Sequence, residues 1–235
     1  MPQPPSPDEQ AREIYRRVGA NYDQAPRWFI PGYAASHAMA AVILSQRIGP
    51  AADILVVGAG TGTETLEFAR HSAQWRFLGV DPSPEMLTAA QAKFAPAGIA
   101  GRARLLQGTV ADAPRVQFDA ATAFLALHYV PDDGSRLEQT REVHARLRPG
   151  APFLLINTCI DRASPEFERE LQLCAAFGTR NGAPPQAVAR VIELHRGHTA
   201  FVTPEREQEI LREAGFREIA TFYRALWFHG FVATA

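Results

Sequence analysis

Three closely spaced glycines form the strongest chemical signal in this chain of 235 residues. The run GAGTG at 58–62 directly follows the apolar residues 54–57. Glycine lets the backbone turn tightly and approach a ligand, and a helix that starts after such a loop presents unpaired N–H groups. Asp81 follows about 20 residues later, where an acidic side chain accepts hydrogen bonds from ribose hydroxyls. This constellation predicts a site for a cofactor that contains a nucleoside.

The spacing of the glycines distinguishes between two such cofactors. The dinucleotide fingerprint G-x-G-x-x-G needs a glycine at position 63, where this chain has Thr63. The third glycine comes one residue early and gives G-x-G-x-G. This spacing favours S-adenosylmethionine over NAD, because no pyrophosphate has to be bound. A glycine-rich turn without a ligand is the alternative, and the coincidence of strand, loop, helix and strand-terminal acid argues against it.

Alternating strands and helices must position these residues. Short apolar runs rich in β-branched residues predict strands at 54–58, 75–81, 103–108, 118–127 and 152–158. Helices are predicted at 33–48, 62–71, 83–94, 133–148 and 204–214. Such alternation is typical of a doubly wound α/β sheet. The ending after the last helix predicts two adjacent strands, which must be antiparallel because no crossover fits between them.

Four segments are expected along the chain. Residues 1–50 form an N-terminal helical lid, and residues 51–160 form a Rossmann-like core that binds the cofactor. Residues 161–200 form a helical insertion on the side of the acceptor, and residues 201–235 complete the same sheet. We therefore expect one sheet with two added segments, the lid and the insertion, whose residues select the substrate.

The motifs of this chain resemble those of class I S-adenosylmethionine-dependent methyltransferases. VVGAGTG resembles the glycine loop, and FLGVDPSPEML resembles the acidic second strand with its helix. LQGTVAD, FDAATAFLALHYV and LRPGAPFLLI resemble the third, fourth and fifth strands. The resemblance covers about residues 53–160. It implies the family's seven-stranded, Rossmann-like, doubly wound sheet of order 3-2-1-4-5-7-6, with the last strand antiparallel, and S-adenosyl-L-methionine as the cofactor.

The resemblance also implies a role for individual residues. The glycine loop would pass the methionine moiety, Asp81 would bind the ribose, and Phe124 would lie beside the methionine. Pro82 and Met86 would flank the adenine, and residues 109–110 would hold its edge. The predicted cofactor-binding residues are Tyr33, Gly58, Ala59, Gly60, Thr61, Gly62, Asp81, Pro82, Met86, Thr109, Val110 and Phe124.

A narrower similarity concerns the two ends of the chain. IPGY at 30–33 and the ending REAGFREIATFYRALWFHGFVA are similar to carboxy-S-adenosylmethionine synthases of tRNA wobble-uridine modification. On this resemblance Tyr33 reaches the cofactor from the lid. Those enzymes bind the extra carboxylate with an arginine of the insertion, where this chain offers Arg190 and Arg196, but its glycine motif differs from theirs. We expect an ordinary methyltransferase. A carboxy-S-adenosylmethionine synthase and a non-catalytic S-adenosylmethionine-binding partner are the alternatives.

Candidate residues on the acceptor side come from two places. Methyl transfer is an in-line displacement that needs alignment and exclusion of water more than a fixed set of catalytic groups. His128 and Tyr129 directly follow the fourth strand, at the carboxyl ends of the sheet where ligands bind. Tyr22 and Arg27 belong to an aromatic and cationic cluster in the lid. These four are the predicted catalytic residues. Simple packing at a strand–helix junction is the alternative for His128.

Composition narrows the range of partners. Lys and Arg total 24 against 25 Asp and Glu, a net charge of −1, which disfavours a protein that coats duplex nucleic acid. His195 and His198 lack an obvious third ligand, so no metal is predicted. Two cysteines, a start without a secretory signal and the lack of long apolar runs predict a cytoplasmic protein with no membrane segment. We expect a small, enclosed acceptor, and the aromatic-rich termini are compatible with a homodimer.

Overall fold

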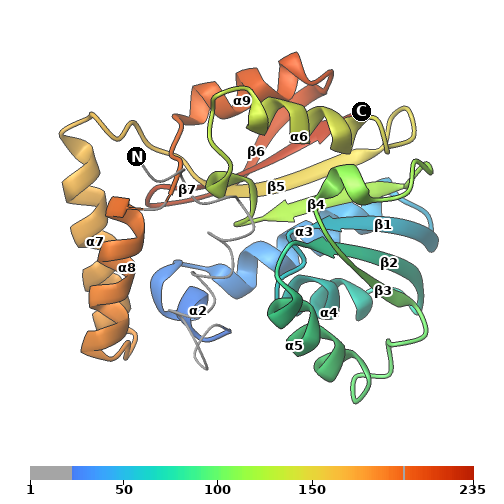
Figure 1. Ribbon diagram of the computed structural model, residues 1–235, viewed down its shortest axis with the longest axis horizontal. Coiled ribbons are helices and arrows are strands. Elements are labelled where there is room, and N and C mark those ends of the chain that lie inside the picture. The colour runs from blue at the N-terminus through green and yellow to red at the C-terminus, as the bar shows by residue number, and fades with distance from the viewer. Residues whose placement is uncertain (1–22, 198) are drawn as a thin grey trace, which may run out of the picture.

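A seven-stranded sheet runs through the middle of the molecule (Figure 1). The computed structural model describes residues 23–197 and 199–235. The strand order is β3-β2-β1-β4-β5-β7-β6, and β7 runs antiparallel to both of its neighbours while the other pairs are parallel. This arrangement confirms the predicted fold. The strands are β1 Ala51–Val57, β2 Gln74–Asp81, β3 Ala103–Gln107, β4 Ala120–Phe124, β5 Pro152–Thr158, β6 Arg217–Ala225 and β7 Phe228–Thr234.

Helices cover both faces of this sheet. In Figure 1, α3, α4 and α5 lie on one face, and α6 and α9 lie on the other. The helices are α2 Ala25–Phe29, α3 Tyr33–Arg47, α4 Thr63–Ala69, α5 Pro84–Phe94, α6 Ser135–His144, α7 Glu166–Arg180, α8 Pro185–Gly197 and α9 Pro204–Glu213. In the part of the chain that the structure describes, no helix combines the length and the apolar character that crossing a bilayer requires.

Strand β1 shows how two cores arise from one strand. Successive side chains of a strand point to opposite faces. Ile54 and Val56 are therefore buried in the core under α3, α4 and α5, where Phe68 is also buried. Leu55 and Val57 are buried in the core under α6 and α9. A strand that is buried on both faces has a continuous run of apolar residues, which is why β1 could be predicted from the sequence.

The fourth strand is shorter than predicted. The sequence predicts a strand over 118–127, but β4 ends at Phe124. The cause is Leu125, whose φ of 56° lies in the left-handed region and turns the chain out of the sheet. A short 3-10 helix, η3 (Leu127–Tyr129), follows at once. The turn therefore places the residues after β4 above the sheet edge rather than within the sheet.

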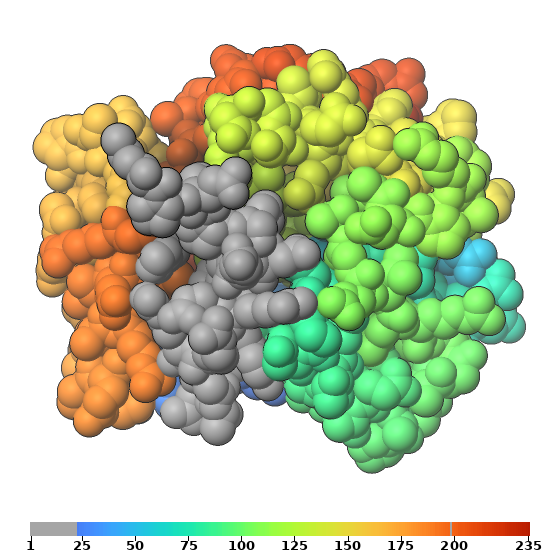
Figure 2. All heavy atoms as spheres, viewed as in Figure 1, coloured from blue at the N-terminus to red at the C-terminus, as the bar shows by residue number. Residues whose placement is uncertain are grey.

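Helices α7 and α8 form a pair beside the main sheet. Figure 2 shows the pair, in light and dark orange, at one end of the molecule. Helix α2 packs on α7, where Gly178 leaves room for the ring of Phe29: a Cβ atom at Gly178 would lie 2.1 Å from that ring. The Cys174 thiol donates to the Phe29 carbonyl at 3.6 Å, and the Asn181 amide donates to the Trp28 carbonyl at 3.2 Å. The segments that the sequence analysis predicts as lid and insertion therefore contact each other directly.

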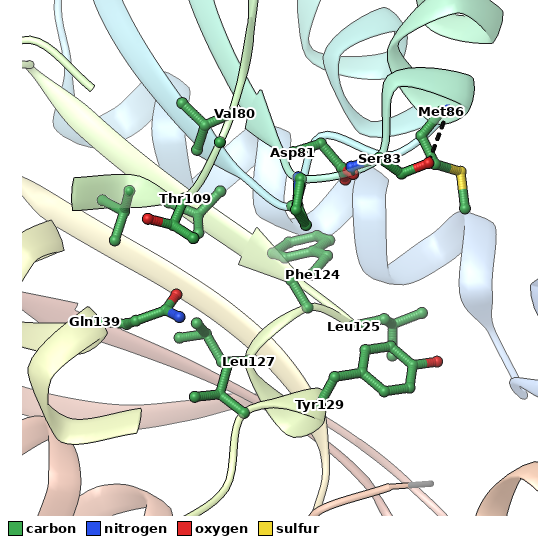
Figure 3. Close-up of a pocket in the computed structure, with 17 residues that line it drawn as sticks. Val80, Asp81, Ser83, Met86, Thr109, Phe124, Leu125, Leu127, Tyr129 and Gln139 are labelled. Atoms are coloured by element: carbon green, nitrogen blue, oxygen red, sulfur yellow. Dashed lines mark hydrogen bonds between the residues drawn. The ribbon is translucent and has the colours of Figure 1, made fainter. Parts of the chain in front are cut away.

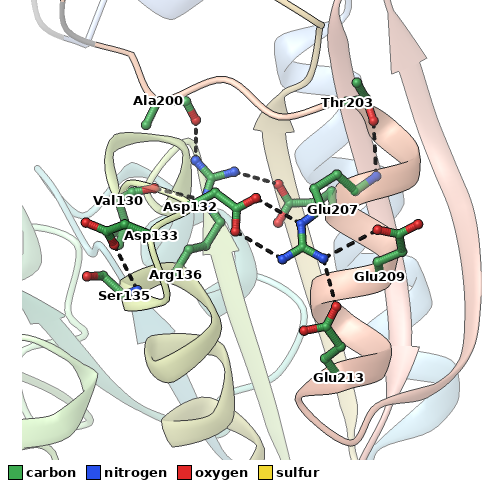
Figure 4. A network of polar contacts seen from close by, with 11 residues as sticks. Val130, Asp132, Asp133, Ser135, Arg136, Ala200, Thr203, Glu207, Glu209 and Glu213 are labelled. Carbon is green, nitrogen blue, oxygen red and sulfur yellow. Dashed lines mark hydrogen bonds and ion pairs between the residues drawn. The ribbon is translucent and has the colours of Figure 1, made fainter.

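A buried ion pair links α6 to α9 (Figure 4). Arg136 Nη1 lies 3.2 Å from Glu207 Oε2, and both side chains are almost fully buried. Arg136 also donates to the Val130 carbonyl at 2.9 Å and to the Ala200 carbonyl. One guanidinium therefore fixes the turn after η3, the end of the insertion and helix α9 relative to one another.

Candidate cofactor and acceptor site

The glycine loop connects β1 to α4 with three positive φ angles, 69° at Gly58, 52° at Gly60 and 79° at Gly62. Glycine is required at two of these positions by packing as well as by φ. A Cβ atom at Gly58 would lie 2.3 Å from the Cβ of Ala126, and one at Gly62 would lie 2.5 Å from the ring of Phe94. The loop backbone therefore lies tightly against the chain that follows β4 and against α5.

Asp81 ends β2 and is held by the glycine loop. Its Oδ2 accepts a hydrogen bond from the Gly60 N–H at 2.8 Å, and its Oδ1 accepts one from the Ser83 N–H at 2.9 Å. Burial raises the pKa of Asp81, and these two N–H donors oppose that rise. Because each oxygen has one protein donor, each keeps a lone pair for a further donor. This is the arrangement that a pair of ribose hydroxyls requires.

A cavity of about 140 Å³ opens beside Asp81. We call it the β2–β4 cavity. The side chains that define it are those of Asp81, Met86, Thr109, Phe124, Tyr129 and Gln139. Figure 3 shows Thr109 and Gln139 on one side of the cavity, with Asp81, Ser83 and Phe124 nearer its middle. The cavity is mostly apolar and has a carboxylate on its wall and an amide at one end, as a nucleoside site requires.

Thr109 is occupied with capping a short 3-10 helix, η2 (Val110–Asp112). The Thr109 N–H donates to Asp112 Oδ2 at 2.8 Å, and its hydroxyl donates to the same oxygen at 3.1 Å. The Asp112 carboxylate is therefore turned toward Thr109 and does not line the cavity. The amide of Gln139, which comes from α6, is the polar group that faces this end.

A second, smaller cavity lies between α3, α4 and the glycine loop. We call it the α3–α4 cavity, and the side chains that define it are those of Asp23, Tyr33, His37, Thr61, Glu64 and Phe124. It shares Gly58, Phe124 and Leu125 with the β2–β4 cavity, so the two cavities adjoin. Asp23 accepts hydrogen bonds from the Thr61 hydroxyl and from Lys93. These contacts join the start of the lid to the glycine loop.

His128 and Tyr129 lie at the end of β4, in η3. The Nδ1 atom of His128 accepts a hydrogen bond from the Thr158 N–H at 3.2 Å, so the neutral ring carries its proton on Nε2. Burial holds the pKa of His128 well below its ordinary value and raises the pKa of Tyr129 to about 12. The two rings meet edge to face, with centroids 4.3 Å apart. Both side chains are therefore uncharged hydrogen-bond donors near neutral pH.

The structure brings nearly all of the predicted cofactor residues together. Eleven of the twelve line one of the two cavities, and Gly62 instead caps α4. Among the predicted catalytic residues, Tyr129 lines the β2–β4 cavity, whereas His128 lies outside both lining sets. Arg27 is exposed on α2 with its guanidinium 6.0 Å from the centroid of the Tyr33 ring. Tyr22 lies outside the described residues.

Sequence reasoning missed Asp23, His37, Glu64 and Gln139. They reach the cavities from the lid and from the helices, with no local motif of their own. Glu64 alone carried a signal, because it lies two residues after the last glycine of the loop.

His195 and His198 are the two histidines considered above as metal ligands. His195 lines neither cavity. His195 stacks on the Trp227 ring, with centroids 4.9 Å apart, and its Nδ1 hydrogen bonds to the Val191 carbonyl at 2.8 Å. His198 lies outside the described residues. Across residues 23–197 and 199–235, no three or more His, Cys, Asp or Glu side chains gather as a metal ion would need.

The sheet order, the glycine loop after β1 and the acidic end of β2 together define the class I methyltransferase fold. Comparison with known proteins agrees with this. Residues 54–150 match the family described as a methyltransferase domain. The chain is 26% identical to a demethylmenaquinone methyltransferase of Symbiobacterium thermophilum, over 92% of this chain and 89% of that protein. It is 27% identical to a carboxy-S-adenosyl-L-methionine synthase of Methylococcus capsulatus, over 92% and 90% of the two chains.

Solved structures show the same fold. Human N-acetylserotonin methyltransferase, solved in complex with S-adenosylmethionine, superposes with a TM-score of 0.65 at 18% identity. The match covers 98% of this chain and 60% of that one. The methyltransferase-domain match and the relatives support a class I S-adenosylmethionine-dependent methyltransferase, and the solved structures show its fold.

Proposed function

We propose that this methyltransferase transfers a methyl group from S-adenosylmethionine to an oxygen, nitrogen or carbon atom of a small-molecule acceptor. The observation that carries the proposal is the joining of the two cavities at Gly58 and Phe124, with Asp81 oriented by two N–H donors on the wall of one of them. A ligand with a nucleoside at one end and an amino acid at the other fits this pair of spaces.

The nucleoside half fits the β2–β4 cavity. In this proposal Asp81 accepts hydrogen bonds from the ribose hydroxyls, and the apolar side chains of Pro82 and Met86 flank the adenine. The Gln139 amide offers one donor and one acceptor to the edge of the base, which is the pattern that adenine presents. The methionine half extends past Phe124 and the glycine loop into the α3–α4 cavity, under Tyr33.

The residues after β4 support a mechanism based on alignment. When bound, S-adenosylmethionine supplies a methyl group activated by the neighbouring sulfonium. Tyr129 lines the β2–β4 cavity and carries its proton near neutral pH, so it orients an acceptor rather than deprotonating it. His128 lines neither cavity, and its ring supports the turn after β4 by accepting a hydrogen bond from the Thr158 N–H. Orientation and exclusion of water can supply about 7–11 kcal/mol of the barrier. The main roles of this chain are therefore to hold the two reactants in line and to keep the site dry.

The contact between α2 and α7 supports a small, enclosed acceptor. Phe29 of the lid fits against Gly178 of the insertion, so the two segments that we assign to the acceptor side pack against each other. A net charge of −1 gives no general attraction to polyanions. These observations favour a small molecule over a nucleic acid as the acceptor.

The arginines of α8 argue against a carboxylated cofactor. Arg190 is exposed, and Arg196 forms a two-point ion pair with Glu168 at 3.2 and 2.7 Å on the surface. Neither lines one of the two cavities. A cofactor with an added carboxylate would find no partner in these two residues, which favours unmodified S-adenosylmethionine.

Mass spectrometry under native conditions tests this proposal. The ligand that copurifies with the full chain is released and identified, and the protein is then incubated with methyl-labelled S-adenosylmethionine and a panel of small phenols, carboxylic acids, amines and quinols. We expect S-adenosylmethionine or S-adenosylhomocysteine as the ligand and labelled product from one acceptor class. A ligand heavier by one carboxyl group would overturn the proposal in favour of a carboxylated cofactor.

A further inference from the structure

Glu64 is a buried acid with one carboxyl oxygen that is unpaired within the described part of the chain. It lies on the first turn of α4, lines the α3–α4 cavity and is only 6% exposed. Its Oε1 atom has no hydrogen-bond partner among the described residues. The hydroxyl of Thr122 on β4 lies beside the carboxyl, but it too lacks a partner in good hydrogen-bond geometry. A carboxyl group that is buried without a partner is costly, so its presence here calls for a ligand.

The other acid of this cavity is already occupied. Asp23 accepts hydrogen bonds from Thr61 and Lys93 and a longer one from Thr63 at 3.3 Å. Glu64 is therefore the carboxyl of this cavity that is free to receive a cation. The side chains that meet it from α3 are Tyr33 and His37, which supply aromatic walls and no positive charge at neutral pH.

The cofactor brings a matching group to this position. In the proposed binding mode the ribose lies at Asp81, so the amino-acid end of the cofactor extends along the glycine loop into the α3–α4 cavity. That end carries an α-ammonium with three N–H donors, and a buried carboxylate is a strong partner for such a group. We propose that Glu64 binds the α-ammonium of S-adenosylmethionine and gives up its own proton when it does so. This inference rests on the proposed function.

The proton balance of this step is simple. Burial raises the pKa of Glu64 to about 8, so in the free enzyme the carboxyl carries its proton at neutral pH. When the ammonium enters, the Glu64 O–H bond breaks, the proton passes to the buffer and the carboxylate pairs with the cation. Affinity therefore falls as the pH drops below about 8, because the proton competes with the ligand.

Three titratable side chains line the cavity with Glu64, and none of them explains such a titration. Burial raises the pKa of Tyr33 and lowers that of His37. Burial would also raise the pKa of Asp23, but hydrogen bonds from Lys93 and Thr61 hold it below its ordinary value. The charged or ionisable groups of the neighbouring elements are Arg27 of α2, Glu67 of α4, Asp81 of β2 and Lys93 of α5.

Calorimetry with three ligands tests the assignment. S-adenosylmethionine and S-adenosylhomocysteine carry the ammonium, and 5′-methylthioadenosine has the nucleoside without it. Glu64→Gln is expected to weaken the first two alike, by about 10- to 100-fold, and to leave the third within about twofold. The control is Glu67→Gln, which alters the next turn of α4, where Glu67 pairs with the exposed Arg70. Gln139→Leu should instead weaken all three ligands, because it acts on the base.

Proton release gives a second, independent measurement. Titration of the wild-type protein with S-adenosylhomocysteine at pH 7, in buffers of different ionisation enthalpy, should show release of about 0.9 proton, as a group of pKa about 8 requires. Glu64→Gln should release none. Unchanged affinity in Glu64→Gln, a loss confined to S-adenosylmethionine, or a wild-type titration without proton release would each overturn the assignment. Failure of the proposed function would look different: a carboxylated ligand or the lack of a labelled product would be found by mass spectrometry, while the effects of Glu64→Gln on binding would remain.

Discussion

The most direct test of the site is the substitution Asp81→Asn. The side chain keeps its size, but one carboxylate oxygen becomes an NH₂ group that cannot accept a hydrogen bond. Both oxygens now receive protein donors, from Gly60 at 2.8 Å and from Ser83 at 2.9 Å. In the variant one of these N–H groups must face another donor. The substitution therefore affects the glycine loop as well as the ligand.

The expected magnitudes follow from these contacts. Loss of a charge-assisted hydrogen bond to the ribose costs about 1.5–3 kcal/mol, which raises the Kd by about 10- to 150-fold. One buried N–H left without an acceptor lowers the free energy of unfolding by about 1–3 kcal/mol. Affinity and stability should therefore both fall, and by comparable amounts.

The assay combines calorimetry with S-adenosylhomocysteine and unfolding in urea. The control is Asp53→Asn, which removes an acid of β1 whose carboxylate pairs with the exposed Arg76 at 2.7 and 2.9 Å, away from both cavities. It should change affinity by less than about twofold, and stability by about 0–1 kcal/mol. If Asp81→Asn lowers stability but binds the ligand as the wild type does, Asp81 supports the loop only, and the ribose contact is wrong.

Three further outcomes are expected. Gly58→Ala places a Cβ atom at a φ of 69° and 2.3 Å from Ala126, so thermal denaturation should show that the free energy of unfolding falls by about 2–6 kcal/mol. The control Gly98→Ala has a φ of 71° in open space, so its free energy of unfolding should fall by only about 1–3 kcal/mol. Equal losses in the two variants would refute the contact at Gly58. Arg136→Met leaves Glu207 buried without its cation, so urea unfolding should show a loss of about 3–5 kcal/mol in the free energy of unfolding. Adding Glu207→Leu to this variant should restore most of the lost stability. A double variant as unstable as the single one would contradict the argument. Burial lowers the pKa of His195 from 6.5 to about 4, so the unfolded chain binds the extra proton first and the free energy of unfolding should decrease as the pH falls from 6.5 to 4. His195→Phe should make that decrease shallower in urea titrations at several pH values, and an unchanged slope would exclude His195 as its source.

Local patterns were enough to predict most of the fold and many of the residues that line the β2–β4 cavity. The buried strand β1, the glycines after it and Asp81 all lie within one stretch of sequence, where a strand, a loop and a helix determine one another. Phe124 lines both cavities from the end of β4, although this strand ends three residues earlier than predicted. The positive φ of Leu125 could not be predicted from the sequence, because leucine rarely adopts such an angle.

The remaining site residues could not be predicted because they depend on how distant elements meet. Gln139 is one polar residue of a polar helix, and only the packing of α6 over η2 turns it toward the cavity. Asp23 acquires its role through Lys93, which lies on α5. Asp112 lies close to Thr109 in the sequence but does not line the β2–β4 cavity, because its carboxylate caps Thr109.

The contact of Phe29 with Gly178 limits which substitutions this chain can tolerate in evolution. Each residue leaves room for the other, so a side chain larger than glycine at 178 needs a smaller one at 29. Substitutions at these two positions are therefore expected to occur as pairs in related chains. Under the proposed function, exchanging acceptor specificity between such chains would require moving residues 1–50 and 161–200 together.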